Sequence, residues 1–179
     1  MTALDRQANL LGALALVVTD QTAQTVAAAA GQSVSAAAAL SALHHFLDRP
    51  TLDQLRKVLG LTPSGAVRLV DRLADAGLVT RGTGGDGRSR SVLLTEAGKR
   101  AAQQITAARA ALLRSVLDEL SPAERETLHS LMSQIMASVV GSKERGAWIC
   151  RLCDLDACGR PAGSRAVPRL PGPARITRV

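Results

Sequence analysis

Aromatic side chains are almost absent from this chain of 179 residues, which has one Trp, one Phe and no Tyr. The hydrophobic core must therefore consist of Leu, Val and Ala, a composition that suits closely packed helices. The same lack leaves no aromatic platform on which the bases of single-stranded nucleic acid could stack. The length fits one domain with a substantial core.

Motifs that carry enzymatic chemistry are also missing. The sequence contains no Ser-His-Asp arrangement, no phosphate-cradling glycine loop and no H-E-x-x-H zinc motif. The three histidines, His44, His45 and His129, are typical of surface or core positions on helices. We therefore expect a protein that is not an enzyme.

The net charge of +7 is unevenly distributed along the chain. Residues 51–90 carry seven basic and four acidic side chains, and residues 143–179 carry eight and three. Most of the excess thus lies in the tail, so the total charge is poor support for nucleic-acid binding. The local excess of +3 in residues 51–90 is the relevant quantity.

The N-terminal segment has two interpretations. The apolar run Leu10–Val18 could form the core of a signal peptide, but Asp5 cancels the charge of Arg6, and the run is too short to span a bilayer. A helical stripe favours a dimerisation helix over residues 1–34 in a cytoplasmic protein with no membrane association. The residues of this stripe are Leu4, Leu11, Leu14 and Val18.

Two short helices joined by a tight turn are predicted after residue 50. Thr51 can cap the first helix, and Thr62 can cap the second, with Pro63 in the first helical position, where no N–H is needed. Gly77 ends the second helix. Such a helix-turn-helix places its second helix in a DNA major groove. The inner face of that helix is predicted as Val67, Val70, Leu73 and Ala74, and the outer face as Ser64, Gly65, Arg68 and Arg72.

A basic hairpin follows. Leu78–Thr80 and Val92–Leu94 are short β-type runs, and residues 81–90 between them are polar and rich in glycine. Asp86 is expected to stabilise this loop by accepting backbone N–H groups or by holding an arginine. Phosphate-binding capacity comes from Arg81, Arg88 and Arg90. Residues 35–95 therefore predict a winged helix-turn-helix within a mainly α fold.

Residues 96–142 predict two long amphipathic helices. Thr95 caps the first, which reaches about Leu120, and Ser121 begins the second with Glu124 placed for a capping box. Their apolar stripes exceed what the small domain can cover, so we expect a homodimer, although packing within a monomer is an alternative. The stripes are Ile105, Ala108, Leu112 and Val116 on the first helix, and Leu128, Leu131, Ile135 and Val139 on the second.

Residues 143–179 form a basic tail, expected to be flexible, that contains all three cysteines. Cys150 and Cys153 have a C-x-x-C spacing that can hold a metal ion from one turn, and Cys158 can reach the same ion. Zinc or an iron–sulfur centre would need a fourth ligand, for which Asp154, Asp156, an exogenous group or the other subunit are candidates. A disulfide-based redox switch and incidental thiols are the alternatives.

Taken together, these segments resemble the MarR family of bacterial transcription regulators. The resemblance implies a homodimer that binds a pseudo-palindromic operator in double-stranded DNA and is released by a small-molecule effector or an oxidant. It assigns groove contacts to the outer-face residues and wing contacts to the three arginines; Gly87 stands where relatives often have arginine. The residues that carry the resemblance are Leu61–Ser64, Leu69–Leu73, Ala76–Val79, Arg81, Asp86, Arg88 and Leu94–Gly98.

The sequence therefore predicts a DNA-binding transcription regulator, most simply a repressor. One alternative is a metal- or redox-responsive protein that acts through its cysteine tail. The other is a winged helix used only for protein docking, against which the exposed Arg68 and the arginine-rich wing argue.

Overall fold

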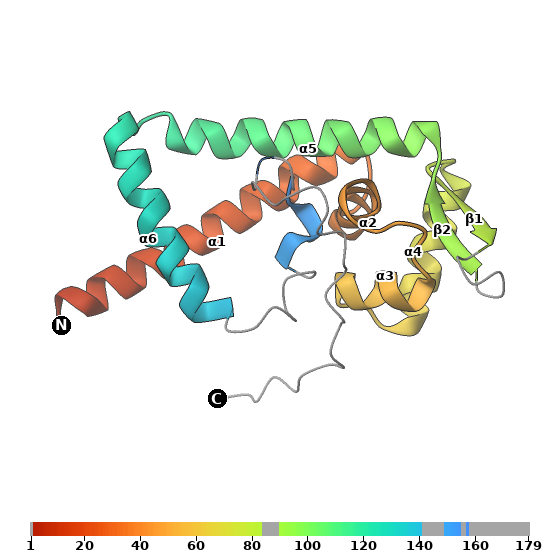
Figure 1. The fold of residues 1–179 in the computed structure, drawn as a ribbon, viewed down its shortest axis with the longest axis horizontal. Coiled ribbons are helices and arrows are strands. Elements are labelled where there is room, and N and C mark those ends of the chain that lie inside the picture. Colours follow the sequence, from red (N-terminus) through yellow and green to blue (C-terminus); the bar gives the residue numbers. More distant parts are fainter. Residues whose placement is uncertain (1, 84–89, 141–148, 155–156, 158–179) are drawn as a thin grey trace.

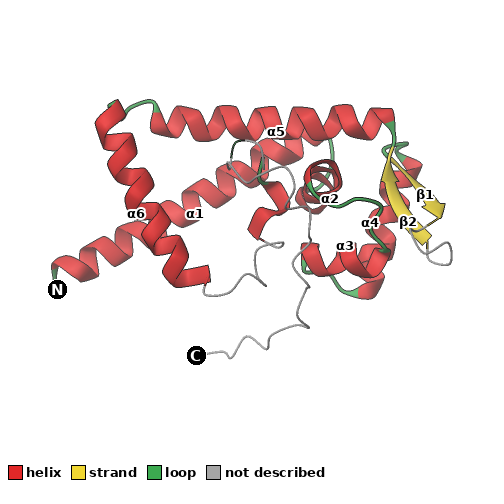
Figure 2. Ribbon diagram, viewed as in Figure 1, coloured by secondary structure: helices red, strands yellow, loops and turns green. Residues whose placement is uncertain are grey.

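Six α-helices and one two-stranded antiparallel sheet make up the part of the chain that this computed structural model describes, residues 2–83, 90–140, 149–154 and 157 (Figures 1 and 2). The predicted mainly α fold with a two-stranded wing is confirmed. In chain order the elements are α1 (Ala3–Ala30), α2 (Val34–His45), α3 (Leu52–Leu59), α4 (Pro63–Asp75), β1 (Val79–Thr83), β2 (Arg90–Leu94), α5 (Glu96–Leu117), α6 (Pro122–Val140) and the short 3-10 helix η2 (Cys150–Leu152).

Helix α2 lies at the centre of the fold. Every residue from Ala36 to Leu43 is buried, so this helix has no solvent-facing side in its middle. Helices α1, α3 and α5, strand β2 and η2 all pack against it. Leu40 and Leu43 are the two large apolar side chains of this stretch, which otherwise consists of alanines and Ser41. Alanine side chains are short enough to let neighbouring elements approach on the remaining sides, and Leu47 is buried although α2 ends at His45.

Side-chain caps fix where the helices begin. The Thr51 hydroxyl accepts the N–H of Gln54 at 3.2 Å, and the Gln54 side chain accepts the N–H of Thr51 at 2.8 Å. Ser121 and Glu124 form the predicted box before α6. Each cap satisfies an amide that the helix leaves without a partner, which is worth about 1 kcal/mol. The predicted starts of these helices are confirmed, whereas α5 ends at Leu117 rather than near residue 120.

Large apolar side chains remain exposed at the end of the molecule farthest from the wing. Helices α1 and α5 pack together, but the N-terminal half of α1 extends beyond the core, and α6 turns away at the end of α5 (Figure 1). The exposed residues are Leu4, Leu10, Leu11, Leu14, Leu16 and Val17 on α1, and Leu131, Met132, Ile135 and Met136 on α6.

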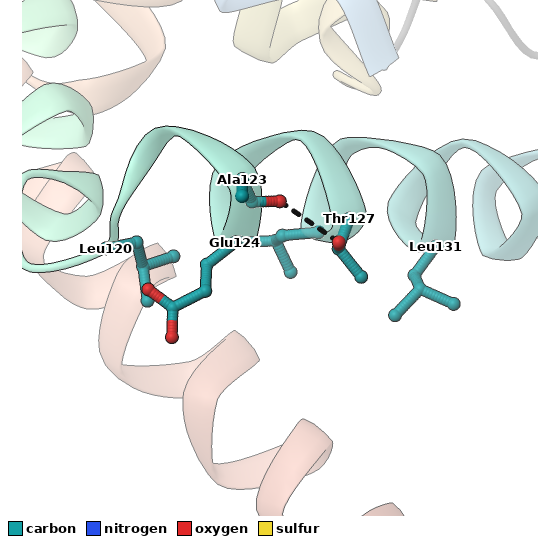
Figure 3. Close-up of a pocket in the computed structure, with 6 residues that line it drawn as sticks. Leu120, Ala123, Glu124, Thr127 and Leu131 are labelled. Atoms are coloured by element: carbon teal, nitrogen blue, oxygen red, sulfur yellow. Dashed lines mark hydrogen bonds between the residues drawn. The ribbon is translucent and has the colours of Figure 1, made fainter.

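A shallow apolar depression lies where α5 turns into α6 (Figure 3). The Thr127 hydroxyl donates to the carbonyl of Ala123 at 3.0 Å within α6, so its methyl group is left for apolar contact. The depression is continuous with the exposed face of α6 through Leu131. Its lining residues are Leu120, Ala123, Glu124, Thr127, Leu128 and Leu131.

Helix α1 is long and apolar enough to cross a membrane if length and composition alone are considered. The predicted absence of a membrane span was based on Leu10–Val18, which form part of this helix of 28 residues. That absence stays a prediction. Core helices and signal sequences satisfy the same criterion. In this fold Val26 is fully buried, and Ala29 and Ala30 pack against the core, so the C-terminal end of α1 belongs to the globular structure.

The start of α5 is fastened to the base of the hairpin. The Thr95 hydroxyl donates to the carbonyl of Gly77 at 2.7 Å and accepts the N–H of Gly98 at 3.0 Å. The N–H of Thr95 also donates to the carbonyl of Leu78 at 3.1 Å. The backbones approach so closely that a Cβ atom at Gly98 would overlap the Leu78 carbonyl oxygen. Thr95 therefore joins the wing to the long helix in addition to capping it.

We expect Gly98→Ala to lower the free energy of unfolding by about 1–3 kcal/mol, because the methyl group would force the helix away from the hairpin. Gly12→Ala is the matched control, since a Cβ at this exposed helical position meets nothing within 4 Å. The control should leave stability unchanged or raise it by up to about 1 kcal/mol through helix propensity. Urea denaturation measures both, and equal midpoints for Gly98→Ala and the unmodified protein would contradict the close-packing argument.

Candidate nucleic-acid interface

The outer face of α4 carries three exposed polar side chains in one row. Ser64, Arg68 and Arg72 follow one another at four-residue intervals, so the row extends about 12 Å along the helix. Gly65, the fourth predicted contact, is half-buried, and its N–H donates to the Thr62 hydroxyl at 3.1 Å. A Cβ at Gly65 would lie 3.0 Å from that oxygen.

The inner face of α4 differs from the prediction at Val67. This side chain is 41% exposed, whereas Ala66, Leu69, Val70 and Leu73 are buried. The buried positions have the i, i+3, i+4, i+7 spacing of one helical face, and Val67 falls one step outside it. The prediction of Val67 as a core residue was therefore wrong, and its methyl groups lie beside the polar row.

The strands of the wing are longer than predicted. Val79–Thr83 pairs with Arg90–Leu94, with Arg81 opposite Val92 and Thr83 opposite Arg90. Residues 81–83 and 90 were expected in the loop because they are polar or glycine. The hydrogen bonds between paired strands join backbone groups, so polar side chains and glycine did not prevent residues 81–83 and 90 from joining the sheet.

The wing is also attached to the beginning of the helix-turn-helix. The N–H of Val92 donates to the carbonyl of Pro50 at 3.0 Å, and Thr51 forms an isolated antiparallel bridge with Ser91. Strand β2 therefore bonds to β1 on one edge and to the segment before α3 on the other. This contact joins residues far apart in the sequence, and no local pattern pointed to it.

Basic side chains in this region differ in how they are paired. The carboxylate of Asp53 pairs with Arg56 at 2.6 Å and with Lys57 at 2.8 Å on the exposed side of α3. The hydrogen bond from Lys57, followed by that from Arg56, lowers the pKa of Asp53 below its ordinary value. In contrast, neither Arg68 nor Arg72 forms an ion pair within the described part of the chain. Their charges are available to an external anion.

Arg81 reaches back from β1 to α4, where its guanidinium donates to the carboxylate of Asp71. Both side chains are nearly half exposed. The pair links the wing strand β1 to helix α4. The register that brings these two residues together depends on the fold, so the sequence alone did not pair Asp71 with Arg81.

Several predicted site residues cannot be placed by side chain. Arg88, Asp86 and Cys158 lie outside the described residues, and for Arg90 only the strand position is described. The assignment of Asp86 to wing stabilisation, like the assignments of the DNA contacts, stays a prediction. Cys150 and Cys153 lie at the two ends of the turn that begins with η2.

No group of three or more His, Cys, Asp or Glu side chains in the described part of the chain is placed to hold a metal ion. His45 uses its Nε2 in a 2.9 Å hydrogen bond with the Thr106 hydroxyl, linking α2 to α5, as expected of a structural histidine. His44 packs edge-on against it, with ring centroids 5.0 Å apart.

Known proteins share both the sequence pattern and the fold. Residues 30–89 match the MarR family. The crystal structure of RV1404 from Mycobacterium tuberculosis is similar, with 23% identity over 77% of this chain and 95% of that one and a TM-score of 0.61. MepR, a transcription regulator of the Staphylococcus aureus multidrug efflux pump MepA, aligns at 18% identity over 78% of this chain and 99% of its own, with a TM-score of 0.66.

A variant of the same S. aureus protein bound to an oligodeoxyribonucleotide aligns at 18% identity over 74% of this chain and 97% of its own, with a TM-score of 0.57. The matched residues 30–89 include α3, α4 and β1, whose geometry is described above. Residues 30–89 thus match the MarR family in sequence, and the chain has the fold of MarR-family transcription regulators.

Proposed function

We propose that this chain is a sequence-specific regulator that binds double-stranded DNA in the cytoplasm and represses transcription. The observation that carries the proposal is the row of Ser64, Arg68 and Arg72 on the outer face of α4, with both arginines free of ion pairs among the described residues. Arginine can donate two hydrogen bonds to one guanine edge, and a serine hydroxyl can contact bases or phosphates. The S. aureus variant bound to an oligodeoxyribonucleotide supports this use of the fold.

The wing supplies the second contact in this proposal. Arg81, Arg88 and Arg90 would meet phosphates or the adjacent minor groove while α4 occupies the major groove. The hydrogen bond from β2 to Pro50 and the ion pair of Arg81 with Asp71 support this second contact, because they hold the wing and the helix-turn-helix as one unit. A rigid unit loses little conformational freedom on binding.

The exposed apolar faces of α1 and α6 support a homodimer. A second copy would cover side chains such as Leu14, 51% exposed, and Ile135, 45% exposed, as well as the depression beside Leu131. Two-fold symmetry would then present two α4 helices to a pseudo-palindromic operator, with half-sites about 34 Å apart. A small-molecule effector or an oxidant that shifts the two helices by a few ångström would release the DNA.

Arg68→Ala is expected to weaken operator binding by about 1–3 kcal/mol and to relax selectivity at one base pair. Arg114→Ala is the control, since it removes the same charge from an exposed position near the far end of α5. Fluorescence anisotropy with the upstream DNA and with scrambled DNA of equal length, across a salt series, measures both. Equal effects of the two variants would contradict base readout by Arg68.

Asp71→Asn removes the ion pair between α4 and β1, and the direction in which operator affinity changes tests whether this pair positions Arg81. Electrostatics alone predicts tighter DNA binding, because the change removes a negative charge beside the interface. We expect instead a loss of about two- to fivefold in operator affinity, the worth of an exposed ion pair. Asp75→Asn, on an exposed position of the same helix, should leave affinity unchanged or raise it slightly. Tighter binding by both variants would show that Asp71 does not position Arg81.

Leu131→Glu should shift the protein from dimer to monomer at micromolar concentration, because it places a charge in the surface that the second copy covers. Val67→Glu, which places the same charge on a 41% exposed apolar position of α4, should leave the dimer intact. Sedimentation velocity distinguishes these outcomes. A monomeric unmodified protein, or a dimer in Leu131→Glu, would exclude this surface as the interface.

A further inference from the structure

Residues 149–154 contact the core as a short turn that bears two thiols. The N–H of Cys153 donates to the carbonyl of Cys150 at 2.9 Å, which closes the turn. In a 3-10 helix, side chains three residues apart lie above one another. The Sγ of Cys153 lies 3.8 Å from the carbonyl oxygen of Ile149, so this thiol is directed back over the start of the turn. Cys150 and Cys153 therefore stand one turn apart, at the two ends of the same short turn.

The core holds this turn in place. Helix η2 packs against α2, and Leu152 contacts the hydrophobic core cluster (Figure 1). Cys150 and Cys153 are themselves only partly buried. The leucine thus anchors the turn on a rigid surface, while the thiols can be reached from solution. A pair fixed in this way loses less conformational freedom on binding an ion than a pair in an unstructured segment would.

We propose that Cys150 and Cys153 form a binding site for a soft monovalent metal ion of the Cu(I) type. Thiolates favour soft ions, and two sulfur atoms can complete the linear coordination of such an ion. A structural zinc site would require four ligands, of which this pair supplies half. Each thiol releases one proton as its sulfur–metal bond forms, and the ion keeps its oxidation state.

The site is distinct from the proposed DNA-binding surface. Arg68 and Arg72 lie on α4, whereas η2 packs against α2. Metal binding and DNA binding can therefore be measured separately, and failure of one proposal leaves the other intact.

The test is anaerobic titration of the reduced full-length protein with Cu(I) in the presence of a competing chelator. We expect one ion per chain, with an ultraviolet charge-transfer band from thiolate to metal. Cys150→Ser and Cys153→Ser should each lower the affinity by at least about a hundredfold, more than the loss of a group that only orients a ligand. Thermal unfolding of the metal-free variants, which we expect to match the unmodified protein, establishes that they are folded.

Cys158→Ser is the matched control, since it makes the same change at the remaining cysteine. We expect Cys158→Ser to bind Cu(I) with unchanged stoichiometry and with less than about a tenfold change in affinity. Such a change is smaller than the loss of affinity caused by removing a group that orients a metal ligand. The proposal is overturned if the unmodified protein does not bind Cu(I), or if Cys150→Ser and Cys153→Ser bind it normally. A loss in Cys158→Ser equal to theirs, or displacement of Cu(I) by equimolar Zn²⁺, would also overturn the two-thiolate site.

Discussion

The burial of α2 on all sides is the constraint on which the other elements depend. Its middle is a run of alanines with Leu40 and Leu43, and these residues together offer little volume. Neighbouring backbones can approach closely, so α1, α5, α3 and β2 all contact this one helix. A core almost without aromatic rings can be filled in this way, because small side chains keep packing dense when helices come close.

This arrangement makes α2 the element that joins the long helices to the winged helix-turn-helix. The winged helix-turn-helix is further fixed by contacts outside the core: β2 bonds to Pro50, Arg81 pairs with Asp71, and Thr95 bonds to the base of the hairpin. Each contact is modest, but all three restrict the wing relative to α4. Groove recognition needs such restriction, since hydrogen bonds to base edges tolerate little displacement.

The end of the molecule farthest from the wing exposes apolar side chains instead of burying them. Leu14 and Ile135 are large, apolar and about half exposed, on helices that leave the core. Burying apolar surface contributes about 25 cal/mol per Å², so covering these faces with a second copy would be strongly favourable. The long helix that satisfies the composition of a membrane span therefore carries much of the apolar surface that the proposed dimer would cover.

Local features of the sequence determined the helix starts, the helix-turn-helix and the existence of the wing. Thr51 and Thr62 cap helices through amides three residues away, and apolar periodicity reports one face of a helix, so both can be read without knowing the fold. The outer-face position of Arg68 followed from the same periodicity.

Tertiary structure decided the features that arise only where two segments distant in the sequence come into contact. The exposure of Val67, the complete burial of α2, the extension of the wing strands and the contact of Arg81 with Asp71 all require the register between elements. The packing of η2 on α2 likewise depends on contact between segments distant in the sequence. A residue's own neighbours in sequence restrict its backbone and its side of a helix, whereas its partner across the fold is selected by the packing of the whole chain.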